Sequence, residues 1–183
     1  MSIRRSAIFY CAVLFLAIRQ APAEDLAVLK RRAAAARAAA EKAAAGSFDR
    51  RMARFVLATA LWRQGEQETG TTQLEEAATI YEEVLTSGPC PPPQQPILCP
   101  AARTDLGSVQ RVLGTRKKDV GLVCKAVHSH IAAYAEMPAD QNSGAKESLR
   151  DDVAYLKAQR EPAARACLDG VRDAVKNILG TAP

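Results

Sequence analysis

Cys124 and His128 are the residues of this 183-residue chain whose types and spacing come closest to a chemical site. Because they are four positions apart, they would share one face of a helix, where a thiolate and an imidazole could bind a metal ion or act as nucleophile and base. A second pair of metal ligands is missing, and no motif supplies an oxyanion hole, a phosphate-binding loop or a zinc-protease helix. We therefore predict no catalytic residue, no metal site and no cofactor, and keep a metal-binding or thiol-active protein as an alternative.

Residues 1–23 are typical of a secretory signal peptide. Arg4 and Arg5 precede a 12-residue apolar run, and Ala21-Pro22-Ala23 supplies a small-x-small cleavage pattern. The run is shorter than the roughly 20 residues that span a bilayer. We predict a periplasmic or secreted protein without a membrane span after cleavage, and an uncleaved anchor is the alternative.

Removal of the signal peptide changes the charge. The remaining chain has 22 basic and 20 acidic residues, so its net charge is +2 rather than +5. The basicity of the full chain therefore does not indicate a nucleic-acid partner.

Four cysteines remain after residue 23, and an even number in an exported chain indicates two disulfides. Four cysteines allow three pairings. Cys90 and Cys99 flank a short proline-rich segment, so we pair them, which leaves Cys124 with Cys167. Four free buried thiols are the alternative.

The chain is predicted to be all α, because strong helix formers predominate and no segment has the alternation of a strand. Gly65 and Gly114 are expected to end helices, while Ser47 and Asp119 are expected to cap the helices that follow them. Helices are expected over about residues 25–45, 48–64, 73–87, 100–113, 120–136, 145–159 and 162–179.

Part of the helical pattern recurs at an offset of 49 residues. Such a recurrence predicts stacked helix pairs, which usually form binding surfaces rather than catalytic pockets. The coinciding positions are Ala53/Ala102, Arg54/Arg103, Leu57/Leu106, Gly65/Gly114 and Ala77/Ala126.

The segment 50–136 resembles the tetratricopeptide repeat family, with longer turns than the standard unit. In the second copy Gln110 and His130 stand where the family has apolar residues. The matching positions of the first copy are Leu57, Ala58, Leu61, Gly65, Leu74, Ala77, Tyr81, Val84 and Leu85. The resemblance implies antiparallel helix pairs stacked as a short TPR-like α-solenoid of about 6–7 helices.

The expected organisation has six parts. They are the signal peptide (1–23), an Ala-rich N-terminal helix (24–46), a first TPR-like pair (47–87), a Pro-rich loop closed by Cys90 and Cys99 (88–100), a second pair (101–137) and a divergent third pair or cap (138–183).

The resemblance further implies a groove lined by the first helix of each pair. Its candidate partner-binding residues are Arg54, Ala58, Trp62, Arg103, Gly107 and Arg111. Arg54 and Arg103 are equivalent in the two copies, so we expect them to bind an acidic or C-terminal carboxylate. Trp62 is expected to be a buried anchor, and a half-exposed hot spot is the alternative.

We therefore predict an exported, non-catalytic module of the bacterial envelope that binds a protein or peptide. A compact disulfide-stabilised helical bundle with a structural or inhibitory role is the alternative without a groove.

Charge is also segregated along the sequence. Residues 65–90 contain six glutamates and no basic residue, whereas Arg116, Lys117 and Lys118 form a basic run. Two interpretations remain open: these groups steer a complementary partner, or they pair with each other within the domain.

Overall fold

The structure, a computed structural model, describes residues 25–90, 96–181 and 183 of the chain. The predicted signal peptide and most of the proline-rich segment lie outside these residues. The described residues form helices and no strand, which confirms the all-α class. The helices are α2 (Leu26–Lys42), α3 (Phe48–Gln67), α4 (Thr72–Thr86), α5 (Leu98–Lys117), α6 (Val120–Glu136), α7 (Ser143–Ala158), α8 (Pro162–Gly170) and α9 (Arg172–Leu179).

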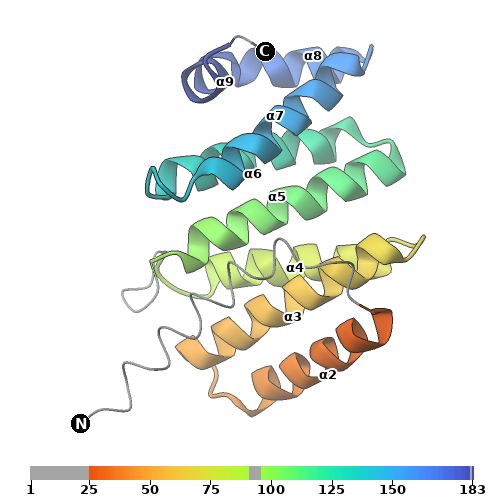
Figure 1. Cartoon of the computed structure of the whole chain (residues 1–183), viewed down its shortest axis with the longest axis vertical. Helices are drawn as coiled ribbons and strands as arrows, with labels where there is room; N and C mark the ends of the chain where they lie inside the picture. Colours follow the sequence, from red (N-terminus) through yellow and green to blue (C-terminus); the bar gives the residue numbers. More distant parts are fainter. Residues whose placement is uncertain (1–24, 91–95, 182) are drawn as a thin grey trace.

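Each helix from α2 to α7 packs chiefly against its neighbours in the sequence. Smaller contacts join α3 to α5 and α5 to α7. Figure 1 shows the resulting stack, with α2 at one end and α8 and α9 at the other. None of the helices in the described ranges has both the length and the apolar character needed to cross a membrane.

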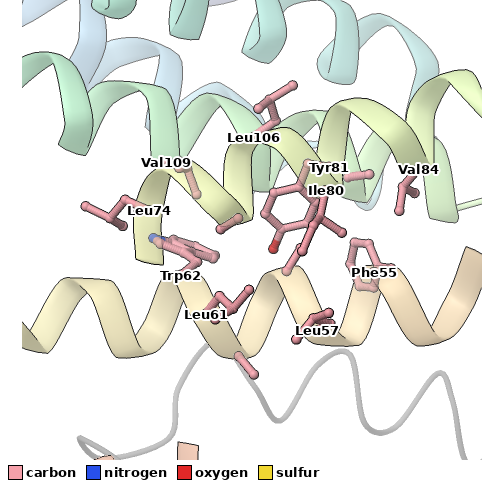
Figure 2. Packing of buried hydrophobic residues seen from close by; sticks show 14 of the residues in the cluster. Phe55, Leu57, Leu61, Trp62, Leu74, Ile80, Tyr81, Val84, Leu106 and Val109 are labelled. Atoms are coloured by element: carbon pink, nitrogen blue, oxygen red, sulfur yellow. The ribbon is translucent and has the colours of Figure 1, made fainter. Parts of the chain in front are cut away.

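Two hydrophobic clusters hold the stack together. The first includes residues of α2, α3, α4 and α5. Among its members are Phe55, Leu61, Trp62 and Tyr81, which are labelled in Figure 2. The second joins α6 to α9. The stripe expected on α4 is buried throughout, with members Leu74, Ala77, Ile80, Tyr81 and Val84. Each large apolar side chain that is fully buried contributes about 1.5–3 kcal/mol.

Gly65 and Gly114 do not end their helices, contrary to the prediction. The helices α3 and α5 continue to Gln67 and Lys117. The two glycines instead allow close packing: a Cβ at position 65 would lie 2.7 Å from Leu74 Cγ, and one at position 114 would lie 2.6 Å from Val123 Cγ2. The close packing that each glycine allows outweighs its poorer helix propensity, which costs about 1 kcal/mol per glycine.

The predictions for the other helix ends are partly confirmed. Ser47 and Asp119 cap α3 and α6 through their side chains, as predicted. The last predicted helix is divided in two, because the backbone leaves helical geometry at Val171 between α8 and α9. The fourth helix begins at Leu98 rather than at Pro100.

The cysteines are paired as predicted. Cys90 bonds to Cys99 with a sequence separation of 9, and Cys124 bonds to Cys167 with a separation of 43. The longer link ties α6 to α8. On the chain-entropy model the short loop contributes about 2.6 kcal/mol and the long loop about 4 kcal/mol.

Candidate functional site

A hollow of about 410 Å³ lies between α2, α3 and α4. Its lining residues are Arg37, Ala40, Glu41, Arg50, Arg54, Leu57, Glu76, Thr79 and Ile80. The apolar members Ala40, Leu57 and Ile80 are buried, whereas the charged members are at least partly exposed. The hollow therefore combines an apolar floor with a charged rim, and its lining is more polar than that of most small-molecule pockets.

The three arginines of this hollow differ in their partners. Arg37 pairs with Glu76, and Arg54 pairs with Glu83 on α4. The side chain of Arg50 has no hydrogen bond or ion pair within the described part of the chain. Arg50 is thus the cation of this rim that can accept an anionic group without first losing a partner.

A second hollow of about 400 Å³ lies between α5 and α7. Both of its arginines are already occupied. Arg111 pairs with Asp151 at 3.0 Å, and Arg116 donates to the backbone carbonyls of Gly65, Gly70 and Glu66. This hollow is therefore less suited to an anionic ligand than the first.

The six predicted partner-binding residues do not form one groove. Ala58 and Gly107 are buried, so their assignment to a binding surface is wrong. At Gly107 the ring of His130 on the neighbouring helix α6 fills the space beside the backbone. Arg103 pairs with Glu136 of its own helix pair at 3.0 Å. Arg54 and Arg111 line different hollows.

Trp62 is a buried residue of the first cluster, as expected from the packing interpretation (Figure 2). The guanidinium of Arg63 lies 4.6 Å from the centre of its ring. The burial of Trp62 therefore contradicts its inclusion among the candidate partner-binding residues.

The segregated charges pair largely within the domain. Lys117 of the basic run pairs with Glu75 at 2.7 Å, and Lys30 on α2 lies 3.6 Å from Glu68. Hydrogen bonding to Lys117 is the largest effect that lowers the pKa of the Glu75 carboxyl. Together with the pairs of Arg37 and Arg54, these contacts favour the interpretation in which the glutamates neutralise basic residues of the same chain.

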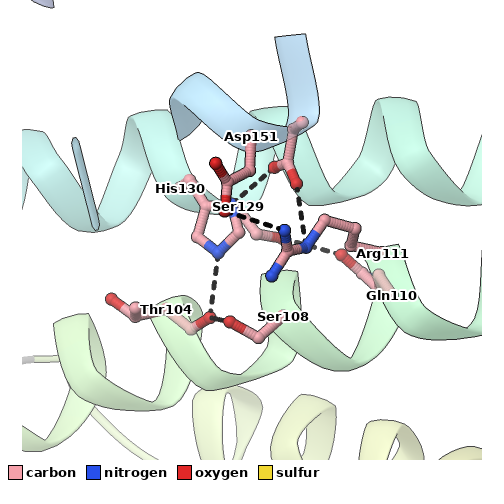
Figure 3. Close-up of polar contacts among 8 residues, drawn as sticks. Thr104, Ser108, Gln110, Arg111, Ser129, His130 and Asp151 are labelled. Atoms are coloured by element: carbon pink, nitrogen blue, oxygen red, sulfur yellow. Dashed lines mark hydrogen bonds and ion pairs between the residues drawn. The ribbon is translucent and has the colours of Figure 1, made fainter. Parts of the chain in front are cut away.

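His130 lies at the centre of a buried polar cluster between α5, α6 and α7 (Figure 3). Its Nδ1 lies 2.6 Å from Asp152 Oδ2, and its Nε2 lies 3.1 Å from the carbonyl oxygen of Thr104. A histidine oriented by an aspartate also occurs in catalytic triads. Here, however, the Thr104 carbonyl occupies the second ring nitrogen, and neither side chain of the pair is exposed. The pair is therefore closed to a substrate.

The hydrogen bonds of His130 indicate which of its ring nitrogens carry a proton. The Thr104 carbonyl can only accept, so Nε2 carries a proton, and Nδ1 shares a second proton with Asp152. Burial raises the pKa of Asp152, and the contacts with His130 and Arg111 act in the opposite direction. Because the pKa of Asp152 is raised in the folded state, protonation of this carboxyl favours folding. The stability gained in this way is fully present below the ordinary pKa of 3.8 and is lost as pH rises through the folded-state pKa.

The alternative based on Cys124 and His128 lacks a free thiolate. Cys124 is bonded to Cys167, and His128 is exposed on α6. No group of three or more potential metal ligands occurs within the residues that the structure describes.

Sequence reasoning missed Arg51, which is 7% exposed. Its Nε donates to the carbonyl of Val84 at 2.7 Å, its Nη1 donates to the carbonyl of Pro89 at 2.9 Å, and its Nη2 donates to Cys90 Sγ at 2.9 Å. A signal was present: Arg51 is in helical register with the apolar residues Phe55 and Ala58. A basic residue on an apolar stripe indicates a buried partner.

No protein-family model, curated protein or solved structure compared with this chain matches it.

Proposed function

We propose that the chain is a non-catalytic helical-repeat protein of the tetratricopeptide type that binds a protein or peptide outside the cytosol. The observation that carries this proposal is the hollow between α2, α3 and α4, where Arg50, which has no side-chain partner among the described residues, lies beside the buried floor formed by Leu57 and Ile80. These features fit a peptide segment in which an acidic residue neighbours an apolar one.

Equivalent contacts in the two helix pairs support the repeat assignment. Gly65 faces Leu74 in the first pair, and Gly114 faces Val123 in the second. Both members of the second contact are 49 positions after those of the first. A shared close approach at the same offset is expected when two copies of one unit have the same packing.

A second correspondence concerns buried polar groups. Tyr81 Oη donates to Asp105 Oδ2 on α5 at 3.3 Å, and His130, 49 positions later, contacts Asp152 on α7 at 2.6 Å. In both cases the second helix of one pair contacts a carboxylate on the first helix of the next. This polar link between successive pairs supports a stack built from repeated units.

The revised ligand site differs from the predicted one. Arg54 and Arg103 each pair with a glutamate, so a carboxylate ligand would have to displace that residue. Arg50 requires no displacement, and a charge-assisted hydrogen bond to it is worth about 1.5–3 kcal/mol. We therefore assign recognition of the acidic group to Arg50.

The compartment assignment is supported by two cysteine pairs at bonding distance. Disulfides persist mainly in oxidising compartments. Together with the signal-peptide pattern of residues 1–23, they favour a periplasmic or secreted location.

Selection of peptides from a phage-displayed random library, followed by fluorescence anisotropy, tests the binding proposal. We expect enrichment of sequences that combine acidic and apolar residues. Arg50→Glu should weaken their binding by about tenfold or more, which corresponds to about 1.4 kcal/mol. The matched control is Arg150→Glu on α7, an exposed arginine that lines neither hollow. Failure to enrich any peptide, or equal loss in both variants, would contradict the proposal.

The compact-bundle alternative is tested by solution scattering. A globular chain of about 160 residues has a radius of gyration of about 15 Å. We expect a larger value for a stack of helix pairs. A value at the globular limit would favour the bundle and a structural role.

A further inference from the structure

The Cys90–Cys99 disulfide lies against a buried cation. Arg51 Nη2 lies 2.9 Å from Cys90 Sγ and 3.3 Å from Cys99 Sγ. Carbonyl oxygens of Val84 and Pro89 accept from the other nitrogens of the same guanidinium and fix its position. Burial lowers the pKa of Arg51 from its ordinary value of 12.5. An arginine nevertheless keeps its charge throughout the ordinary pH range, so a positive charge lies beside both sulfur atoms.

A second feature, the N-terminus of a helix, stabilises negative charge on Cys99. This cysteine lies in the first turn of α5, which begins at Leu98. Backbone N–H groups at a helix N-terminus favour a thiolate, as does a nearby arginine. Both effects are stronger for a charged thiolate than for a neutral disulfide sulfur. They therefore stabilise the reduced form more than the oxidised form.

The two sulfurs differ in access. Cys90 is half-buried at the end of the segment that follows α4, whereas Cys99 is fully buried. An incoming thiolate would therefore reach Cys90, and Cys99 would be the leaving group. A leaving thiol of low pKa accelerates exchange.

We propose that Cys90–Cys99 is a thiol–disulfide exchange site, in which an external dithiol attacks Cys90 and releases Cys99 as a thiolate held by Arg51. A thiolate of the dithiol forms a bond to Cys90 Sγ, and the electron pair of the broken bond passes to Cys99 Sγ. The second thiolate of the dithiol then displaces Cys90 from the mixed disulfide. The dithiol is oxidised by two electrons, the disulfide is reduced by two, and Cys90 takes up a proton.

This step would open the disulfide cross-link between the segment that follows α4 and the first turn of α5. Arg51 would remain in contact with the Val84 and Pro89 carbonyls. The exchange thus opens this cross-link without removing the buried contact beneath it.

The other disulfide provides an internal comparison. Cys124 and Cys167 lie inside α6 and α8, beyond the first turn of either helix. No hydrogen bond to either sulfur occurs among the described residues. The exposure of these two residues resembles that of the first pair, with one half-buried and one buried cysteine. A difference in reactivity would therefore reflect the cation and the helix terminus rather than access.

Reduction of the full chain with dithiothreitol, followed by alkylation and peptide mass mapping, tests the proposal. We expect Cys90–Cys99 to be reduced at least tenfold faster than Cys124–Cys167. Arg51→Met should reduce this ratio by about tenfold, whereas the matched variant Arg54→Met should leave it unchanged. Equal rates in the unsubstituted chain, or faster reduction of Cys124–Cys167, would overturn the proposal even if Arg51→Met fails to fold.

A second measurement isolates the leaving group. In a chain carrying Cys11→Ser and Cys90→Ala, Cys99 is the single free thiol, and its thiolate can be titrated by ultraviolet absorbance. We expect a midpoint at least one pH unit below the ordinary thiol value of about 8.5. A midpoint at or above that value would overturn the assignment of Cys99 as the stabilised leaving group.

Discussion

Gly107 on α5 lies directly against the imidazole of His130 on α6. A Cβ at position 107 would be 2.6 Å from His130 Nε2 and 2.8 Å from the neighbouring ring carbons. The ring cannot move aside freely, because hydrogen bonds to Asp152 and to the Thr104 carbonyl hold both of its nitrogens. The small residue in this first helix therefore sets the distance between α5 and α6.

Gly107→Ala should be destabilising despite the better helix propensity of alanine. The propensity gain is about 1 kcal/mol, whereas overpacking in a buried site costs about 1–3 kcal/mol and here also disturbs two hydrogen bonds. We expect a net loss of about 1–3 kcal/mol in the free energy of unfolding, measured by urea denaturation. The matched control is Gly170→Ala, where a Cβ would meet nothing within 4 Å. A gain in stability in both variants would contradict the prediction.

Asp152→Ala should be far more destabilising than Asp151→Ala, although the residues are adjacent. Asp152 is fully buried against His130, whereas the side chain of Asp151 is 55% exposed in its pair with Arg111. Loss of one partner of a buried pair costs about 3–5 kcal/mol, and loss of an exposed pair about 1 kcal/mol or less. Urea denaturation of the two variants measures this difference. Similar costs for both would show that the His130 contact contributes little.

Tyr81 should make the folded state sensitive to alkaline pH. Burial raises the pKa of its hydroxyl well above the ordinary value, and the charge of Asp105 acts in the same direction. A raised folded-state pKa means that this contribution is complete below about pH 10 and is lost as pH rises further. The free energy of unfolding should then fall by up to about 1.4 kcal/mol per pH unit.

Denaturation of Tyr81→Phe between neutral and alkaline pH isolates this effect. Its alkaline slope should be shallower than that of the unsubstituted chain, even though the lost hydrogen bonds lower its stability at neutral pH. Tyr155→Phe, in a half-buried position on α7, is the control and should keep the original slope. Parallel slopes for all three proteins would contradict the prediction.

Replacement of both cysteines of one disulfide by serine should show how much each disulfide contributes to the free energy of unfolding. On the chain-entropy model, loss of Cys124–Cys167 costs about 4 kcal/mol and loss of Cys90–Cys99 about 2.6 kcal/mol. Thermal and urea unfolding of the two double variants measures both values. A larger cost for the shorter loop would show that its contacts with Arg51, rather than chain entropy, govern its contribution.

The sequence by itself determined the helices, the buried stripe of α4 and the cysteine pairing. These features depend on local propensity, on a period of 3.6 residues and on the count and spacing of cysteines. Residues such as Leu74 and Val84 are buried because their helix has one apolar face, and that face can be identified without knowing its partner.

Only the tertiary structure decided what the special residues do. Gly65 could end a helix or admit Leu74. Arg50 and Arg54 look alike in sequence, although within the described ranges only Arg54 has a glutamate partner. Arg51 contacts sulfur atoms that are 39 and 48 positions away. These outcomes depend on atoms brought together by packing between helices, and local sequence rules carry no information about such distances.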